Sequence, residues 1–220
     1  MLANDFETAR FNMIEQQIRP WEVIDARVLA TLQKLPREAF VDDEYKRLAY
    51  ADIAVPIGEG QSMMKPVQEG RMLQALDVQP GDNVLEIGTG SGFTAACLAD
   101  LGGIVTSYEI HDALSEAAAA RLAALKSKNI ELVVGDGLAA SLAPASFDAI
   151  AVTGSMPVYA NALERLLKPG GRLFVVVGEE PAMQAMLISH VADGGRWEET
   201  LFETVLPALE NAPQAERFHF

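Results

Sequence analysis

The fold is decided by the stretch Val84-Leu85-Glu86-Ile87-Gly88-Thr89-Gly90-Ser91-Gly92. A short apolar run ends here in an acidic residue and passes into a glycine-rich turn, and residues 93–99 then read as an apolar helix. This pattern predicts a strand, a loop and a helix. The backbone of such a loop can approach a ligand closely, because glycine has no Cβ and tolerates positive φ. We therefore expect a ligand-binding loop over residues 88–92.

A second acidic residue, Glu109, ends the next strand-like run, residues 105–108. It follows the glycine loop by about twenty residues, the separation expected for a carboxylate that binds the two hydroxyls of a ribose. Two acids at the ends of neighbouring strands, with glycines between them, indicate a site for a nucleotide-like cofactor.

The spacing of the glycines separates two kinds of cofactor. A dinucleotide fingerprint reads G-x-G-x-x-G and aims a helix N-terminus at a pyrophosphate, whereas Gly92 comes one residue early here. A carboxylate at Glu86 would repel a pyrophosphate but suits the cationic end of S-adenosyl-L-methionine. The residues thus favour this methyl donor over a nicotinamide or flavin dinucleotide. If the loop were only a tight turn, Glu86 and Glu109 would be left unexplained.

Composition and charge exclude several classes of partner. The chain of 220 residues has a formal net charge of -14 and lacks the clustered Lys and Arg that nucleic-acid phosphates require, so no nucleic-acid partner is expected. Residues 1–7 do not read as a signal peptide, and no apolar run approaches the ~20 residues of a membrane span. The one cysteine, Cys97, is expected to be a buried thiol. A cytoplasmic protein without membrane association is predicted.

Strands and helices alternate after residue 81, which is typical of a doubly wound, mostly parallel α/β sheet. We expect further strands over 130–134, 147–153, 172–177 and 197–205, the last at an edge, and helices over 113–126, 159–167 and 182–191. Residues 1–80 are predicted to be a separate helical segment, and residues 81–220 the ligand-binding domain. In the first segment Asp25 would cap a helix, Pro36 would begin another, and residues 53–66 would form a long loop before a helix over 67–76. Residues 211–220 are not assigned.

Motifs spread over nearly the whole chain carry a family resemblance. They are Met13-Ile14-Glu15-Gln16-Gln17, Leu35-Pro36-Arg37-Glu38-Ala39-Phe40-Val41, Leu48-Ala49-Tyr50-Ala51-Asp52, Pro56-Ile57-Gly58 with Gly60-Gln61, the glycine loop, Val134-Gly135-Asp136-Gly137 and Leu167-Lys168-Pro169-Gly170-Gly171-Arg172-Leu173. With these motifs the chain resembles the protein-L-isoaspartate O-methyltransferases. The glycine loop alone indicates a class I methyltransferase, and the N-terminal and Pro-Ile-Gly motifs are more specific to this family.

The resemblance implies a class I, Rossmann-like methyltransferase fold of seven mostly parallel strands, the last of them antiparallel. It also implies S-adenosyl-L-methionine as the donor and methylation of the free carboxylate of isoaspartyl residues in damaged proteins or peptides. By match of motif, Glu109 would hold the ribose hydroxyls, and Asp136 with Gly137 would face the adenine. The methionine end would be lined by Glu86, Gly88, Gly90 and Gly92, with Thr89 and Ser91 between them in the same cofactor-binding loop.

The loop expected at the methyl acceptor departs from the family pattern. After its Gly-Gln pair the family reads Thr-Ile-Ser-x-Pro, with the serine hydroxyl at the acceptor, and this chain reads Ser62-Met63-Met64-Lys65-Pro66. Ser62 keeps a hydroxyl, whereas Met64 brings a thioether that donates no hydrogen bond. Ser62 and Met64 are therefore the candidate catalytic positions. Lys65 is either a positive charge beside the acceptor or a solvated lysine.

A second departure is Gly154-Ser155-Met156-Pro157, where Ser155 would return a hydroxyl to the pocket and Met156 would narrow it. Three functions stay open: isoaspartyl methylation, methylation of another carboxylate or small-molecule acceptor, and donor binding without catalysis. A carboxylate is already ionised at pH 7, so its methylation requires neither a general base nor a metal. The three histidines lie outside the candidate acceptor loop, and His111 is expected at a helix start or on the surface. The oligomeric state is not assigned.

Overall fold

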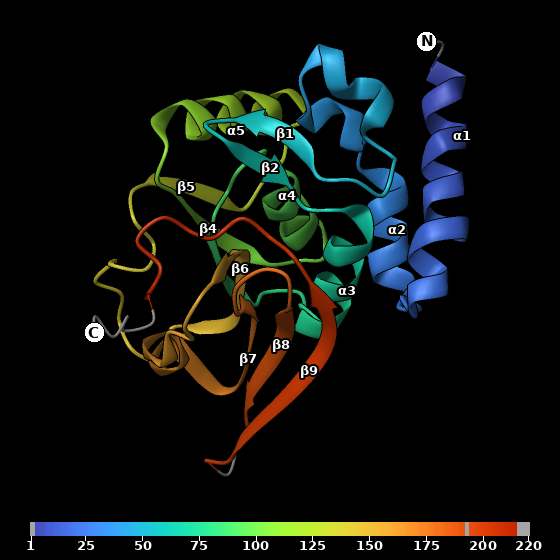
Figure 1. Cartoon of the computed structure of the whole chain (residues 1–220). Coiled ribbons are helices and arrows are strands. Elements are labelled where there is room, and N and C mark those ends of the chain that lie inside the picture. Colours follow the sequence, from blue (N-terminus) through green and yellow to red (C-terminus); the bar gives the residue numbers. More distant parts are fainter. Residues whose placement is uncertain (1–2, 192–193, 215–220) are drawn as a thin grey trace.

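The computed structural model describes residues 3–191 and 194–214. Its main feature is a seven-stranded sheet with the strand order β5-β4-β3-β6-β7-β8-β9 (Figure 1). The strands are β3 Asn83–Ile87, β4 Ile104–Glu109, β5 Ile130–Val134, β6 Phe147–Met156, β7 Leu167–Val177, β8 Met183–His190 and β9 Arg196–Thr204. The expected seven-stranded α/β sheet is confirmed, and the strand predicted over 197–205 lies at an edge.

Six of the seven strands run in the same direction. Strands β3 to β7 pair in parallel with their neighbours, whereas β8 pairs antiparallel with β7 on one side and with β9 on the other. Because β9 opposes β8, it points the same way as the first five strands. The expectation that the last strand is the reversed one is therefore wrong, since the reversed strand is β8.

The helix predicted over residues 182–191 is strand β8. Met, Ala, Leu and Gln favour a helix in isolation, but β8 has a paired strand on each side. Met183 and Ala185 are buried while Gln184 is exposed, the alternation of a strand. Only residues 178–182 connect β7 to β8. A connection this short allows an antiparallel turn but no crossover helix.

Three helices cover one face of the sheet: α3 Pro66–Leu76, α4 Phe93–Asp100 and α5 Asp112–Ala124 (Figure 1). Their apolar side chains share a core with Val84 and Phe174. Because side chains alternate along a strand, Leu85 and Ile150 face the opposite side, where a second core lies. The 3₁₀ turn Asn161–Leu166 packs there in place of the helix predicted over 159–167, because β7 already begins at Leu167.

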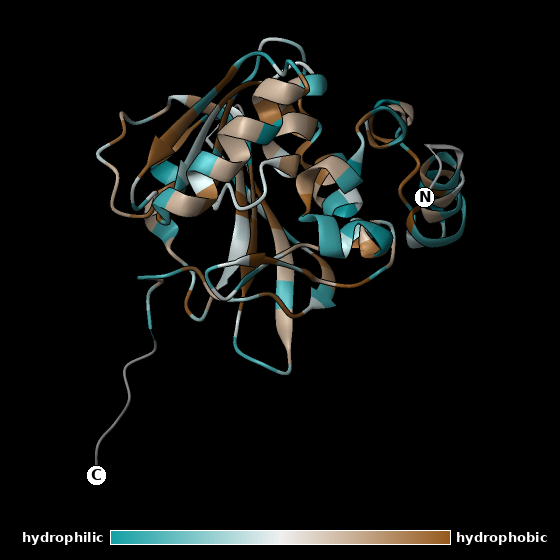
Figure 2. Cartoon of the chain, turned by 90° about the horizontal axis from the view of Figure 1, so that it is seen from above, coloured by the Kyte–Doolittle hydropathy of each residue, from teal (hydrophilic) through white to brown (hydrophobic). Residues whose placement is uncertain are grey.

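The N-terminal segment stands at one side of the molecule in both views (Figures 1 and 2). Its helices are α1 Ala3–Met13 and α2 Ala26–Lys34, and Asp25 caps α2 as predicted by accepting a hydrogen bond from Arg27 N at 2.7 Å. A 3₁₀ turn, Arg37–Phe40, follows Pro36. The buried side chains of this segment belong to the same core as α3, α4 and α5. The division at residue 80 stays a prediction.

The long loop predicted over residues 53–66 contains an antiparallel hairpin of β1 Val55–Gly58 and β2 Gln61–Met63. Its turn is tight because Gly58, Glu59 and Gly60 all have positive φ, of 99°, 51° and 71°. The tip lies next to α5: a Cβ on Gly58 would be 3.8 Å from Leu114 Cδ2. The hairpin thus brings the segment that carries Ser62 toward the start of α5.

Candidate active site

The glycine loop connects β3 to α4 as the sequence predicts, and its three glycines all have positive φ: 100° at Gly88, 52° at Gly90 and 87° at Gly92. Gly88 is the most constrained, because a Cβ there would lie 2.5 Å from Thr153 Oγ1. Thr153 Oγ1 in turn donates to the carbonyl oxygen of Gly88 at 2.5 Å and is 3.0 Å from that of Ile87. Strand β6 therefore holds the start of the loop directly.

Glu109, at the end of β4, is joined to the same loop. Gly90 N donates to Glu109 Oε2 at 2.7 Å, and His111 N donates to Glu109 Oε1 at 3.1 Å. The residue is buried but still lines the main cavity described below. The predicted approach of Glu109 to the glycine loop is thus present, and backbone donors hold the carboxylate in a fixed orientation.

Glu86 lies beneath the loop and is fully buried. Ser107 Oγ donates a short hydrogen bond to Glu86 Oε2, and Thr89 Oγ1 lies 2.6 Å from Ser107 Oγ. Burial is the main cause that raises the pKa of Glu86 to about 8; the Ser107 hydrogen bond opposes this, and the negative charges of Glu109 and Glu69 add to it. Glu86 is not among the residues that line the main cavity, so it supports the loop from below.

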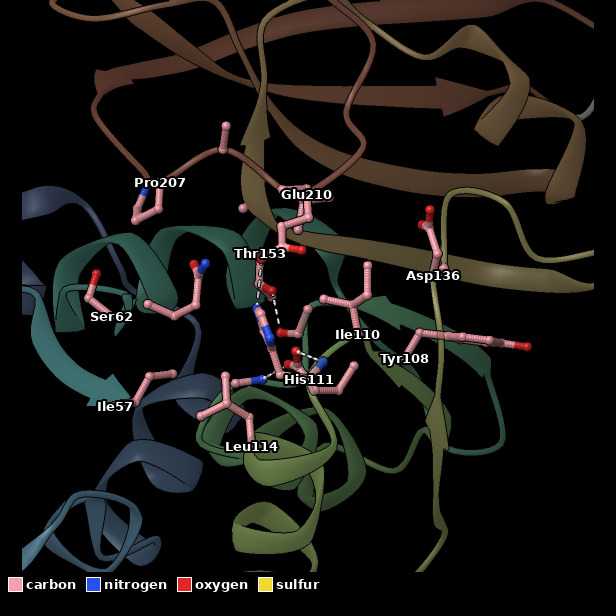
Figure 3. A pocket seen from close by; sticks show the side chains of 18 of the residues that line it. Ile57, Ser62, Tyr108, Ile110, His111, Leu114, Asp136, Thr153, Pro207 and Glu210 are labelled. Carbon is pink, nitrogen blue, oxygen red and sulfur yellow. Dashed lines mark hydrogen bonds and ion pairs between the residues drawn. The ribbon is translucent and has the colours of Figure 1, made fainter. Parts of the chain in front are cut away.

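A main cavity opens at the carboxyl ends of β3, β4 and β6. Figure 3 shows Ser62 and Ile57, from the hairpin, on one side and Asp136 on the other, with His111 and Thr153 between them. Gly88, Gly90, Glu109, Asp136, Gly137 and Ser62 all contribute to the lining. The structure therefore brings these six predicted site residues together around one space.

Asp136 and Gly137 form the far wall of the main cavity. Asp136 Oδ1 accepts a hydrogen bond from Leu138 N at 2.9 Å, and Asp136 Oδ2 accepts one from Asn211 Nδ2 at 3.0 Å. A Cβ on Gly137 would come within 3.0 Å of both Ile87 Cγ2 and Tyr108 Cβ. A larger residue at 137 would therefore push against the two strands that carry Glu86 and Glu109.

Sequence reasoning missed the segment that covers the main cavity from above. Residues 207–210, which follow β9, line the cavity and cross over the end of β6. Ser155 N donates to Pro207 O and Leu209 N donates to Ser155 O, both at 2.9 Å. No local motif marks these residues. The pairing with Ser155 exists only in the folded chain.

His111 was also missed as a site residue. It precedes α5 directly, as expected, but it lines the main cavity as well. Its Nε2 lies 2.9 Å from Glu210 Oε1, and its Nδ1 lies 3.9 Å from Glu59 Oε2. His111 thus joins the covering segment to the hairpin tip. Its position two residues after Glu109 is the one sequence signal that could have indicated this.

A smaller chamber lies between the glycine loop and the β1–β2 hairpin. Thr89 and Ser91 line it from the loop side, and Ser62 and Met64 line it from the other side. Met64 is almost fully buried and packs in the main core, while its carbonyl accepts a hydrogen bond from Arg37. The structure thus places both candidate catalytic positions beside the glycine loop.

Two further expectations about the pocket are corrected, and the alternatives left open for Lys65 are narrowed. The Ser155 hydroxyl donates to Leu206 O at 2.9 Å and is fully buried, so it faces the covering segment and not the cavity. Met156 is fully buried in the second core and does not narrow the cavity. Lys65 lines a different hollow together with Trp21 and Phe202. Lys65 therefore does not line the main cavity and does not bring a positive charge into it.

Three further features of the described residues concern metal binding, membrane spanning and the reactivity of the cysteine. Among residues 3–191 and 194–214, no cluster of three or more His, Cys, Asp or Glu side chains could hold a metal ion. The same part of the chain contains no helix long and apolar enough to cross a membrane. Cys97 is buried, and burial raises the pKa of its thiol well above the usual value, as suits a structural residue.

Comparison with known proteins identifies a family. Residues 9–208 match the family model described as Protein-L-isoaspartate(D-aspartate) O-methyltransferase (PCMT). A protein-L-isoaspartate O-methyltransferase of Methylorubrum extorquens (strain PA1) is 44% identical over 183 residues, which cover 83% of this chain and 79% of the relative. One from Methanoculleus marisnigri (strain ATCC 35101 / DSM 1498 / JR1) is 42% identical over 178 residues, 81% of each protein.

Solved structures show the same fold. A Plasmodium falciparum crystal structure, described as a protein-L-isoaspartate O-methyltransferase in complex with S-adenosyl-L-homocysteine, matches with a TM-score of 0.78 at 20% identity. The match covers 93% of this chain and 98% of that one. A second structure with the name protein-L-isoaspartate O-methyltransferase matches with a TM-score of 0.77 at 24% identity, over 93% of this chain and 66% of the other.

Proposed function

The chain belongs to the protein-L-isoaspartate(D-aspartate) O-methyltransferase family, and from this premise we propose how its cavity methylates an isoaspartyl carboxylate. It is an enzyme with S-adenosyl-L-methionine as methyl donor. The observation that carries the proposal is the placement of Ser62 on the cavity wall, opposite Asp136 and next to the glycine loop (Figure 3). Acceptor and donor residues thus face one space.

The residues present fit the donor. Gly88 and Gly90 leave room that a Cβ would fill, since a Cβ would meet Thr153 at 2.5 Å and Ile57 at 3.1 Å. The acidic side chains of Glu109 and Asp136 line the cavity, which suits a cation better than a pyrophosphate. We assign Glu109 to the ribose hydroxyls, Asp136 and Gly137 to the adenine, and the glycine loop to the methionine end. Glu86 supports this loop through Ser107 and Thr89.

The bound donor supplies an activated methyl group on a sulfonium. The protein's task is then to desolvate the acceptor carboxylate and to hold its oxygen in line, which contributes ~7–11 kcal/mol in well-oriented reactions. No general base is needed, because the carboxylate is ionised at neutral pH. The Ser62 hydroxyl lies on the cavity wall and can donate to the second carboxylate oxygen.

One observation favours a second candidate function. Met64 presents an apolar side chain to the chamber beside the glycine loop, at the position where the family pattern has a serine. A pocket without that hydroxyl binds an isoaspartyl carboxylate with one hydrogen-bond donor fewer. A methyltransferase of the same fold that acts on a different carboxylate is therefore the alternative. We also infer a cytoplasmic enzyme that acts on damaged proteins, in keeping with its family.

The acceptor is tested with labelled S-adenosyl-L-methionine and a pair of peptides that differ only in an isoaspartyl or a normal aspartyl linkage. Isoaspartyl methylation gives a base-labile methyl ester on the first peptide and none on the second. Turnover of the donor with other peptides, but no ester on the isoaspartyl peptide, would establish the second candidate instead.

A Ser62→Ala substitution tests the acceptor side. Loss of a hydroxyl that orients the carboxylate should lower kcat/KM for the isoaspartyl peptide by more than about tenfold. The affinity for S-adenosyl-L-homocysteine should change much less. Ser141→Ala, at an exposed serine, is the matched control. Turnover by Ser62→Ala within twofold of the parent would remove Ser62 from the mechanism.

A further inference from the structure

Glu69 faces the small chamber between the glycine loop and the β1–β2 hairpin, and no sequence motif marked it. It lies in the first turn of α3 and is 2% exposed, yet it lines this chamber together with Thr89, Ser91 and Ser62. A carboxylate so deeply buried is costly unless it is paired or binds a cation. Glu69 is paired with Arg37 and also faces the chamber, so its carboxylate is available to a ligand there.

The Glu69 carboxylate is held by Arg37, which is equally buried. One guanidinium nitrogen of Arg37 pairs with Glu69 Oε2, another donates to the Met64 carbonyl, and the guanidinium carbon lies 5.0 Å from the centre of the Phe93 ring. These contacts fix the Arg37 side chain, and through it they fix Glu69. The carboxylate is thus oriented before any ligand enters, which lowers the cost of binding.

The charges around the chamber favour a cation. Glu69 is on its wall, and Glu86 lies close enough that the charge of Glu69 contributes to its raised pKa. Within the described residues, the positive charge of Arg37 pairs with Glu69 alone. The remaining lining residues are uncharged: Ile57, Ser62, Met63, Met64, Gly88, Thr89, Gly90, Ser91, Thr94 and Thr153. An ammonium group in this chamber is attracted to the Glu69 carboxylate.

The chamber adjoins the main cavity, since Ile57, Ser62, Gly88, Gly90 and Thr153 line both. A donor with its adenine at Asp136 and its ribose at Glu109 would have its methionine end at the glycine loop, beside the chamber. We propose that Glu69 receives the α-ammonium group at the methionine end of the donor. This inference rests on the proposed function and assigns to Glu69, on α3, the contact that the sequence assigned to Glu86.

The test is a cycle of two proteins and two ligands measured by calorimetry. The parent and Glu69→Gln are each titrated with S-adenosyl-L-homocysteine and with its analogue that lacks the amino group. Removal of the amine should weaken binding to the parent by about tenfold or more, the value of one charge-assisted hydrogen bond. In Glu69→Gln the two ligands should bind within about threefold of each other. Glu38→Gln, at another carboxylate paired with an arginine, is the control.

An equal effect of amine removal in the parent and in Glu69→Gln would overturn the assignment, and Glu69 would then only anchor Arg37. If the variant does not fold, a crystal structure of the parent with S-adenosyl-L-homocysteine decides. An ammonium nitrogen within about 3.2 Å of the Glu69 carboxylate supports the proposal, and one beyond about 4.5 Å refutes it. Failure of the proposed function would appear separately, as ligand binding without isoaspartyl methylation.

Discussion

At the scale of single residues, the site depends on two kinds of position. Gly88 and Gly137 are needed for space, because a Cβ at either would meet neighbouring side chains at 3.0 Å or less. Glu86, Glu69 and Glu109 are the acids at or beneath the site, and each is buried. The sequence marked the glycines and two of the three acids. Glu69 was missed because its partner Arg37 is 32 residues away along the chain.

Gly88→Ala should damage donor binding more than folding. The new Cβ would lie 2.5 Å from Thr153 Oγ1, and the backbone would keep a φ of 100° that costs a non-glycine residue about 1–2 kcal/mol. We expect the affinity for S-adenosyl-L-homocysteine, measured by calorimetry, to fall at least about tenfold as the loop shifts.

Gly170→Ala is the matched control for this substitution. Gly170 also has a positive φ, of 82°, but a Cβ there meets nothing within 4 Å. Gly170→Ala should lower the thermal midpoint of unfolding by about as much as Gly88→Ala does, and it should leave the affinity for S-adenosyl-L-homocysteine unchanged. An equal loss of affinity in both variants would show that backbone strain, and not the contact with Thr153, explains the effect at Gly88.

At the scale of elements, the covering segment (residues 207–210) and strand β8 are two features that the sequence analysis did not predict. Both are governed by pairing with distant parts of the chain. Ser155 Oγ bonds to Leu206 O across 51 residues, and β8 is hydrogen-bonded to β7 and β9. Local helix propensity is weak, and two ladders of backbone hydrogen bonds override it. The strand alternation at Met183, Gln184 and Ala185 was the available signal.

Ser155→Ala should loosen the covering segment. The substitution leaves the buried Leu206 carbonyl without its side-chain donor, a loss of about 1–3 kcal/mol in the free energy of unfolding. Because the segment lines the cavity, hydrogen exchange of its amides should become faster, and donor affinity should fall. Ser146→Ala is the control, since its hydroxyl bonds to Ala143 O on an exposed turn. Unchanged exchange at the amides of residues 208–210 would contradict a covering role.

At the scale of the whole molecule, buried acids couple stability to pH. Burial is the main cause that raises the pKa of Glu86 to about 8 and that of Glu69 to about 7, both from an ordinary value of 4.5. Between about pH 4.5 and these raised values, the two carboxyl groups are deprotonated in the unfolded chain but still bind protons in the folded chain. The free energy of unfolding therefore falls as pH rises from about 4.5 to about 8, and this contribution is constant above that window.

We expect the thermal midpoint of the ligand-free protein to be higher at pH 6 than at pH 8.5, as measured by calorimetry at constant ionic strength. Glu86→Gln should flatten this dependence, because it removes the group with the larger shift. A cationic donor favours the ionised acids, so saturating S-adenosyl-L-methionine should also reduce the difference between the two pH values. A parent midpoint that rises steadily from pH 6 to pH 8.5 would refute the assignment.

The sequence by itself determined the features that depend on neighbouring residues. Glycines at fixed spacing predicted the positive-φ loop, an acid at each strand end predicted Glu86 and Glu109 near that loop, and the family motifs predicted the enzyme class. These features are local because the conformational freedom of a glycine and the end of a strand each depend on only a few neighbouring residues.

Only the tertiary structure decided which acid lines the chamber, which strand is reversed and what covers the cavity. Glu86 lies beneath the loop while Glu69 lines the chamber, β8 runs against six strands, and residues 207–210 close the cavity over Ser155. Each of these outcomes rests on contacts between residues far apart in the chain. Burial and strand pairing set their energies, and neither quantity exists until the chain has folded.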